Sequence, residues 1–159
     1  MSTRNSGQVN FCWPDCCCAI IFLVRDMKVI ILSEALNELL LRSFSGSQVQ
    51  GYLLGKRTGQ GLFVERILVL SWRQLLNSEF FFQVEKNQGK EILGVFSLNS
   101  KSRELKKVLN PLFYEKIFLN LATKTGQELR PEVYLVNFDH RFFFEPLGQI
   151  IMEMEVADD

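Results

Sequence analysis

The apolar positions of this chain alternate between compact β-type runs and helix-type spacing. Compact runs predict strands over residues 28–32, 49–56, 62–72, 80–84, 92–98, 132–138 and 142–146, and an edge strand over 150–156. Between the first two runs, Leu36, Leu39, Leu40 and Phe44 recur at three- and four-residue steps, which predicts a helix with these residues on one face. Ser33 is the predicted N-cap of that helix, and Gly46 is its predicted stop.

Two further helices are predicted in the second half of the chain. A short helix is expected over 102–109, because apolar residues lie on one face and lysines on the other. A second is expected from Pro111, because Asn110 offers a capping side chain and proline favours the first helical position. The segment 73–79 is ambiguous and is compatible with a helical turn.

This order of elements predicts a mixed α+β fold. We expect a single domain in which a twisted, mostly antiparallel sheet is flanked by about three helices. Strict alternation of strands and helices is missing, which argues against a doubly wound nucleotide-binding fold.

Length and composition indicate one globular domain. The 159 residues are 47% hydrophobic and 23% charged, which is typical of a chain with a packed core. Lys plus Arg and Asp plus Glu both number 18, so the zero net charge does not favour nucleic acid or an acidic membrane as a partner. We expect a domain over 27–156, a leader over 1–26 that is disordered or adds a strand, a cytoplasmic location and no cofactor.

All four cysteines lie in the leader, between Cys12 and Cys18. Disulfides between such close neighbours would be strained, and adjacent cysteines fit a tetrahedral zinc site poorly. S-acylation beside the apolar run 19–24 is an alternative, which would make the protein a membrane-peripheral module. That run is too short to cross a bilayer, which takes roughly 20 apolar residues.

Phenylalanines are concentrated in two triplets. The triplets are Phe80, Phe81 and Phe82, and Phe142, Phe143 and Phe144. Three adjacent side chains cannot all face one side of a strand. We therefore expect some of them to pack in the core, and the two triplets are the candidate surface for contact with a protein partner.

The single histidine, His140, follows Asp139 directly. Adjacent residues of a strand point in opposite directions, which favours a solvated turn over a catalytic pair. An enzyme of unrelated chemistry, using the Cys12–Cys18 cluster or Asp139 and His140, is the alternative function that these residues leave open.

Two β-type runs carry internal glycines. They are Gly51-Tyr-Leu-Leu-Gly55 and Ile92-Leu-Gly94-Val-Phe96. A glycine inside a strand indicates that another backbone passes close by, or that a strand end must stay open.

With a strand and a helix before the first run, this pattern resembles the JAMM/MPN family over about residues 28–138. In catalytic members, a glutamate three residues before the first glycine handles protons on a zinc-bound water. Their second run ends in His-Ser/Thr-His-Pro, and a Ser-x-x-Asp follows; the two histidines and the aspartate hold the zinc. The resemblance implies an MPN-like fold with a helix before the histidine strand. In catalytic members it also implies cleavage of isopeptide bonds, often to ubiquitin-like proteins.

The chain departs from that pattern at each chemical position. Gln48 stands where the glutamate would be, and Ser97 and Asn99 stand where the histidines would be. A glutamine cannot act as a base, a chain with one histidine holds no His-x-His pair, and neutral oxygens are poor zinc ligands. We therefore interpret Gln48, Ser97 and Asn99 as vestigial positions of a zinc site.

Taken together, these features predict a non-catalytic, MPN-like interaction or scaffold domain. The resemblance implies a protein partner, either another MPN-like subunit or a second copy of the chain. No nucleic acid, membrane, metal or cofactor is expected as a partner.

Overall fold

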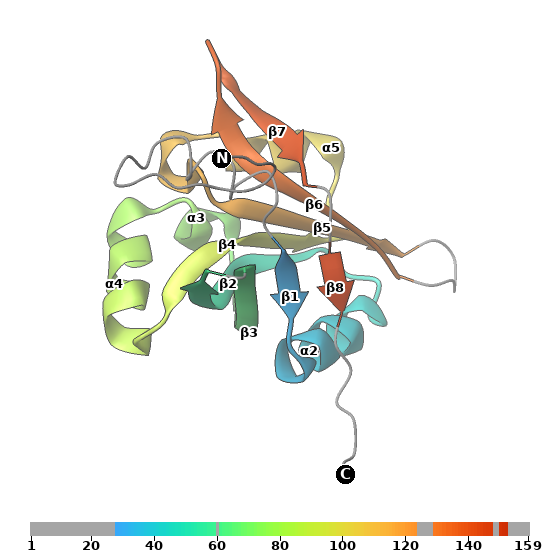
Figure 1. Cartoon of the computed structure of the whole chain (residues 1–159). Coiled ribbons are helices and arrows are strands. Elements are labelled where there is room, and N and C mark those ends of the chain that lie inside the picture. The colour runs from blue at the N-terminus through green and yellow to red at the C-terminus, as the bar shows by residue number, and fades with distance from the viewer. Residues whose placement is uncertain (1–27, 60, 124–128, 148–149, 153–159) are drawn as a thin grey trace, which may run out of the picture.

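A single curled sheet dominates the protein (Figure 1). The computed structural model describes residues 28–59, 61–123, 129–147 and 150–152. The strands are β1 (Val29–Ile31), β2 (Val49–Thr58), β3 (Gly61–Leu70), β4 (Glu91–Leu98), β5 (Ile117–Thr123), β6 (Leu129–Phe138), β7 (Phe142–Pro146) and β8 (Ile150–Met152). They form one eight-stranded sheet in the order β7-β6-β5-β4-β2-β3-β1-β8.

The helices are short or cover one end of the sheet. They are α2 (Ser33–Ser43), α3 (Trp72–Leu75), α4 (Ser78–Gln88) and α5 (Ser102–Leu105), with 3₁₀ turns η1 (Lys106–Val108) and η2 (Pro111–Phe113). In Figure 1, α3 and α4 lie to the left of the sheet and α2 lies below it. None of the helices in the described part of the chain is long and apolar enough to span a membrane.

The two faces of the sheet bury separate apolar clusters. One cluster contains Leu53 and Phe96 from the central strands together with Leu36 and Leu39 of α2. The other contains Tyr52 and Val95 from the same strands, packed with Leu75, Phe81 and Phe113 from the elements on the opposite face. Because successive residues of a strand point to opposite faces, β2 and β4 contribute to both clusters. Both strands are therefore buried on each side.

The predicted fold class is wrong in its balance of elements and in its strand directions. The sheet is mixed, because β1 runs parallel to both β3 and β8, and β4 runs parallel to β5. Among the described helices, only α2 and α4 are longer than about one turn, and each has 11 residues. The protein is thus a curled mixed sheet with few helices, rather than a mostly antiparallel sheet between about three helices.

The strand predicted over 80–84 is wrong, because these residues lie in α4. Asn77 caps this helix by accepting a hydrogen bond from the Phe80 amide at 2.8 Å, and Gly89 ends it with a left-handed φ of 65°. Phe81 and Val84, three residues apart, form its buried face. The aromatic triplet has strand propensity, but the cap and the glycine decide the outcome.

The helix predicted from Pro111 is also wrong. Asn110 does cap a turn, accepting from the Leu112 amide at 2.8 Å, but the turn is a single 3₁₀ turn. Glu115 reverses the chain with φ 65°, and Ile117 then begins β5. From Ile117 on, apolar residues also recur at every second position, at Leu119 and Leu121, so the four-residue spacing alone does not separate helix from strand.

The start and end of α2 differ from the prediction. The N-cap is Leu32 rather than Ser33, and no side chain caps the first turn. Phe44, predicted to lie on the same face as Leu36, is the C-cap residue and is 81% exposed. The predicted stop at Gly46 is confirmed by its left-handed φ of 73°.

The remaining elements agree with the sequence analysis. The hairpins over β2 and β3 and over β6 and β7, the strand β4 and the helix α2 are confirmed. The helix expected over 102–109 is present as α5 followed by η1, and the ambiguous segment 73–79 contains the end of α3 and the start of α4. The leader 1–26, its cysteines and residues 153–156 lie outside the described residues.

Candidate functional site at the ends of β2 and β4

The three predicted vestigial positions come together at one end of the sheet. Strands β2 and β4 pair antiparallel, with Gln50 opposite Ser97 and Val49 opposite Leu98. The pairing ends there, and beyond it Asn99 Nδ2 donates to the Ser47 carbonyl at 3.5 Å, which brings Asn99 beside the turn that holds Gln48. Gln48, Ser97 and Asn99 are thus neighbours in space although 49 residues or more separate the first from the others in the sequence.

Ser97 is a buried polar residue without a hydrogen-bond partner. Its side chain is 0% exposed and its Oγ makes no hydrogen bond. The Oγ of Ser100, three residues further on, is also buried without a partner. A buried hydroxyl without a hydrogen-bond partner costs stability, so these two serines are an unfavourable feature of an otherwise apolar region.

Ser97 belongs to a row of polar residues that the sequence analysis missed. Its cross-strand neighbours are Gln50 on β2 and Asn120 on β5, and Asn120 pairs in turn with Glu132 on β6. Gln50 Nε2 donates to the Leu70 carbonyl at 2.5 Å, and Asn120 Nδ2 donates to Glu132 Oε1 at 3.4 Å. Only the strand register reveals this row, because its members come from four separate strands.

Tyr134 joins the outer end of the same row. Its hydroxyl donates to Glu132 Oε1 at 3.3 Å. Partial burial raises the pKa of the Tyr134 phenol, and the neighbouring Glu132 carboxylate raises it further. The phenol therefore stays protonated and acts as a hydrogen-bond donor rather than as a base.

Asn99 has a structural role at the end of β4. It adopts a left-handed φ of 58°, a conformation that asparagine tolerates better than most residues. Its backbone N–H donates to the Leu121 carbonyl at 3.0 Å, and its side-chain Nδ2 donates to the Ser47 carbonyl at 3.5 Å. Asn99 thereby joins the end of β4 to β5 and to the turn before β2.

The chemistry available at this site is neutral. A glutamine, a serine and an asparagine offer amide and hydroxyl groups, none of which is a base or a good zinc ligand at neutral pH. Across the residues that the structure describes, no group of three or more His, Cys, Asp or Glu side chains is placed to hold a metal ion. The site can donate and accept hydrogen bonds but does not offer the groups that activate water.

Surface hollows lie elsewhere. One of about 580 Å³ lies on the hairpin of β2 and β3 and is lined by Leu32, Lys56, Thr58, Gly59, Phe63 and Glu65. Another of about 250 Å³ lies beside α3 and α4 and is lined by Arg73, Gln74, Asn77, Glu79, Phe80 and Gln83. Gln48, Ser97 and Asn99 line neither of them.

Close backbone contacts explain the glycines of β2 and β4. A Cβ atom added at Gly51 would lie 1.9 Å from the Leu68 carbonyl oxygen, and one at Gly94 would lie 2.0 Å from the Ile117 carbonyl oxygen. Gly55 is equally restricted by the Phe63 carbonyl oxygen, at 1.9 Å. The expectation that another backbone passes close to these glycines is confirmed, so their role is to let strands approach.

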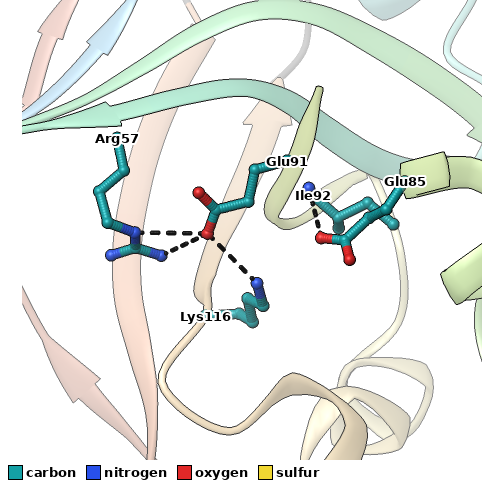
Figure 2. Close-up of polar contacts among 5 residues, drawn as sticks. All are labelled: Arg57, Glu85, Glu91, Ile92 and Lys116. Atoms are coloured by element: carbon teal, nitrogen blue, oxygen red, sulfur yellow. Dashed lines mark hydrogen bonds and ion pairs between the residues drawn. The ribbon is translucent and has the colours of Figure 1, made fainter. Parts of the chain in front are cut away.

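A charged cluster holds the opposite end of β4 (Figure 2). Glu91 Oε2 accepts hydrogen bonds from Arg57 Nη2 at 3.0 Å and Nε at 3.3 Å, and lies 3.5 Å from Lys116 Nζ. Nearby, Glu85 Oε2 accepts from the Ile92 amide at 3.0 Å, which fastens α4 to the start of β4. Because the Glu91 carboxylate is paired with two cations, we interpret this cluster as structural.

The other candidate residues are dispersed. His140 is at the tip of the β6–β7 hairpin with φ 70°; its side chain is 95% exposed, and its Nε2 lies 3.6 Å from Asp139 Oδ1. In the first aromatic triplet, Phe81 is buried, Phe80 is half-buried and Phe82 is 62% exposed. The second triplet, Phe142, Phe143 and Phe144, is half-buried, and Phe144 stacks on Phe118 with ring centroids 5.0 Å apart.

Comparison with known proteins identifies a shared fold. No family model matches the chain, and no curated protein matches it. Among solved structures, the chain is similar to the solution structure of protein DSY2949 from Desulfitobacterium hafniense, with a TM-score of 0.56 and 15% sequence identity. The match covers 81% of this chain and 95% of that chain. At this identity the similarity shows the fold alone.

Proposed function

We propose that this protein is a non-catalytic, MPN-like domain that works by contact with another protein. The single observation that carries the proposal is the convergence of Gln48, Ser97 and Asn99. In the JAMM/MPN family the matching positions hold the proton-transferring glutamate and two zinc-binding histidines. Here the corresponding residues lie at the ends of the paired strands β2 and β4 and carry neutral side chains, which supports the proposal.

The element before β4 supports the resemblance. The family has a helix ahead of the strand that bears the histidines, and α4 occupies that place in this chain. Gly51, Gly55 and Gly94 keep the family's strand pattern for a packing reason, since each lies against a neighbouring backbone. The scaffold is thus retained where it serves packing and altered where it would serve zinc chemistry.

The altered residues make hydrolysis by the family's route unfavourable on chemical grounds. A Gln48 amide does not accept a proton from water near neutral pH, and Ser97 and Asn99 do not neutralise a divalent ion. A contact protein in the cytoplasm is the function that remains, with another MPN-like subunit or a second copy as its partner. The aromatic triplets, with Phe82 exposed and Phe142 half-buried, would provide the contact rather than the neutral site.

A hydrolysis assay tests this proposal. We expect the purified full-length protein to leave isopeptide-linked and linear ubiquitin-like substrates intact, with and without added zinc. The control is the Asn99→Gly variant, which keeps the left-handed conformation and removes the side chain. Cleavage by the wild-type protein that is lost in this variant would contradict the proposal.

A stability measurement on Ser97 tests whether its buried hydroxyl lacks a hydrogen-bond partner in solution. Ser97→Ala removes a buried hydroxyl that has no partner, so we expect the free energy of unfolding to rise by about 1 kcal/mol in urea denaturation. Ser43→Ala is the matched control, because Ser43 is also buried but its Oγ donates to the Leu40 carbonyl at 2.7 Å. That variant should show no such gain. A loss of stability in Ser97→Ala would mean that the hydroxyl has a partner in solution.

A further inference from the structure

Strand β7 is an edge of the sheet with one side of its backbone unused. It stands at one end of the strand order and pairs only with β6 among the described strands (Figure 1). The outer side of an edge strand presents N–H and C=O groups that can pair with a further strand. The outer side of β7 is therefore able to take up one more strand.

Two hydrogen bonds at the ends of β7 show how its backbone is oriented. At one end, the Leu147 N–H donates to the Val133 carbonyl at 3.0 Å. At the other end, the Asp139 N–H donates to the Arg141 carbonyl at 3.0 Å. Both pairs continue the antiparallel register of β6 with β7. Since backbone groups alternate between the two sides of a strand, the odd-numbered residues from 141 to 147 face β6.

The even-numbered residues of β7 therefore turn their backbone groups outward. Phe142 and Phe144 each present one N–H and one C=O, whereas Pro146 presents only a C=O because proline has no N–H. In the described part of the chain, no backbone hydrogen bond ties these outward groups to another segment. The outer edge thus offers two complete sets of donor and acceptor, and Pro146 then ends the row.

The aromatic side chains of β7 leave apolar surface beside this edge. Phe142 and Phe144 pack against the second apolar cluster and are half-buried, and Phe143 points to the opposite face. Phe142 also contacts two exposed rings, with centroids 4.9 Å from Phe138 and 6.3 Å from Tyr114. A strand added at this edge would cover part of that surface.

Two opposite charges flank Phe143 on the same face of the sheet. Arg141 is exposed just before β7, and its guanidinium forms no ion pair with any described residue. Glu145 lies near the end of β7, where its Oε1 accepts from Asn137 Nδ2 at 2.7 Å, and no described cation pairs with it. Charges of one sign on an edge strand oppose its pairing with an identical strand. This edge instead carries one charge of each sign.

We propose that a second copy of this chain pairs with this edge, with the two β7 strands antiparallel about a twofold axis. This inference rests on the proposed contact function and names its partner and its surface. With Phe143 of the two copies opposite each other, Phe142 of each copy lies opposite Phe144 of the other. Each such pair exchanges two N–H···O=C bonds, so the outward groups of both residues are all satisfied.

The backbone and the charges select the same register. In that register Arg141 of each copy lies opposite Glu145 of the other, at a position without backbone bonds, where side chains approach most closely. A shift by two residues, with Phe144 opposite itself, would place Phe142 opposite Pro146, which has no N–H to donate. It would also separate the two charges. A shift the other way would place part of the strand opposite the hairpin turn.

The size of the surface predicts a weak dimer. Five residues of strand are about 17 Å long, so one edge falls short of the roughly 800 Å² per partner of a standard interface. We therefore expect dimers at high protein concentration and monomers on dilution.

Sedimentation equilibrium of the full-length chain over a wide concentration range tests the proposal. We expect Arg141→Glu and Glu145→Arg each to weaken self-association about tenfold or more, because each places two pairs of like charges at the interface. Arg66→Glu is the matched control, because Arg66 is also exposed but lies on the internal strand β3, and it should dimerise as the wild-type protein does. Circular dichroism checks that each variant is folded.

An exchange of charges tests the register. The variant that combines Arg141→Glu with Glu145→Arg again places opposite charges across the twofold axis, so it should dimerise as the wild-type protein does. An equimolar mixture of the two single variants should also dimerise, for the same reason. Phe142→Pro removes an outward N–H without touching the bonds to β6, and it should weaken the dimer.

A wild-type protein that is monomeric at every concentration overturns the proposal. A dimer that persists in both single charge variants also overturns it, as does a combined variant that stays monomeric. Running the hydrolysis assay on the same samples separates the two ideas: a monomer without cleavage removes only this dimer, whereas cleavage removes the proposed function.

Discussion

Replacing Gly51 with alanine should lower the free energy of unfolding by about 3 kcal/mol, since the core around it has no room for a methyl group. The added Cβ would lie 1.9 Å from the Leu68 carbonyl oxygen and 2.8 Å from the Phe96 ring. Relief requires β2 to move away from β3, which disturbs the hydrogen bonds between these strands and both apolar clusters. Urea denaturation followed by circular dichroism measures the change.

Gly59→Ala provides the matched control for this prediction. Gly59 lies at the turn of the same hairpin, and a Cβ there would meet nothing within 4 Å. Its replacement should change stability by no more than about 0.5 kcal/mol. Equal losses in the two variants would contradict the view that the Gly51 position is reserved for close backbone packing.

Replacing Ser97 with histidine, the residue that catalytic JAMM/MPN members carry there, should also destabilise the protein by about 3 kcal/mol. Ser97 is 0% exposed, so an imidazole ring must displace packed atoms and bury a polar ring without a partner. Added zinc should not restore the lost stability, because the cross-strand neighbours of Ser97 in the described residues, Gln50 and Asn120, are neither histidines nor carboxylates. Thermal unfolding with and without zinc measures both effects.

Ser102→His is the control for the chemical change alone. Ser102 is exposed at the start of α5, five residues beyond Ser97, and its replacement should leave stability within about 0.5 kcal/mol of the wild-type protein. If Ser97→His were as stable as the Ser102 variant and gained stability from zinc, the position would be an open metal site. That result would contradict the buried Ser97 and the neutral site described above.

The elements that the sequence predicts correctly are those with a local sequence pattern of their own. The β2–β3 hairpin follows from two apolar runs around Gly59 and Gly61, and α2 follows from the helical spacing of its leucines. The family resemblance assigns Gln48, Ser97 and Asn99 to one vestigial site. Their alignment in the structure depends on the register of β2 against β4.

Other features depend on long-range pairing that the sequence does not display. Ile117 begins a strand rather than continuing a helix because β4 and β6 flank it and supply its backbone partners. The polar neighbours of Ser97, Gln50 and Asn120, come from strands that are distant in the sequence. The exposure of Phe44 depends on where α2 ends, and helical spacing alone placed it on the wrong side.

The metal content of the purified protein tests the central claim most directly. We expect elemental analysis of the full-length protein, and of a variant with Cys12, Cys16, Cys17 and Cys18 replaced by serine, to find no stoichiometric zinc in either. One equivalent of zinc in both proteins would place a metal at the ends of β2 and β4 or elsewhere in the domain. One equivalent in the wild-type protein alone would place it at the cysteine cluster. Either result would contradict a domain that works by contact and without a metal.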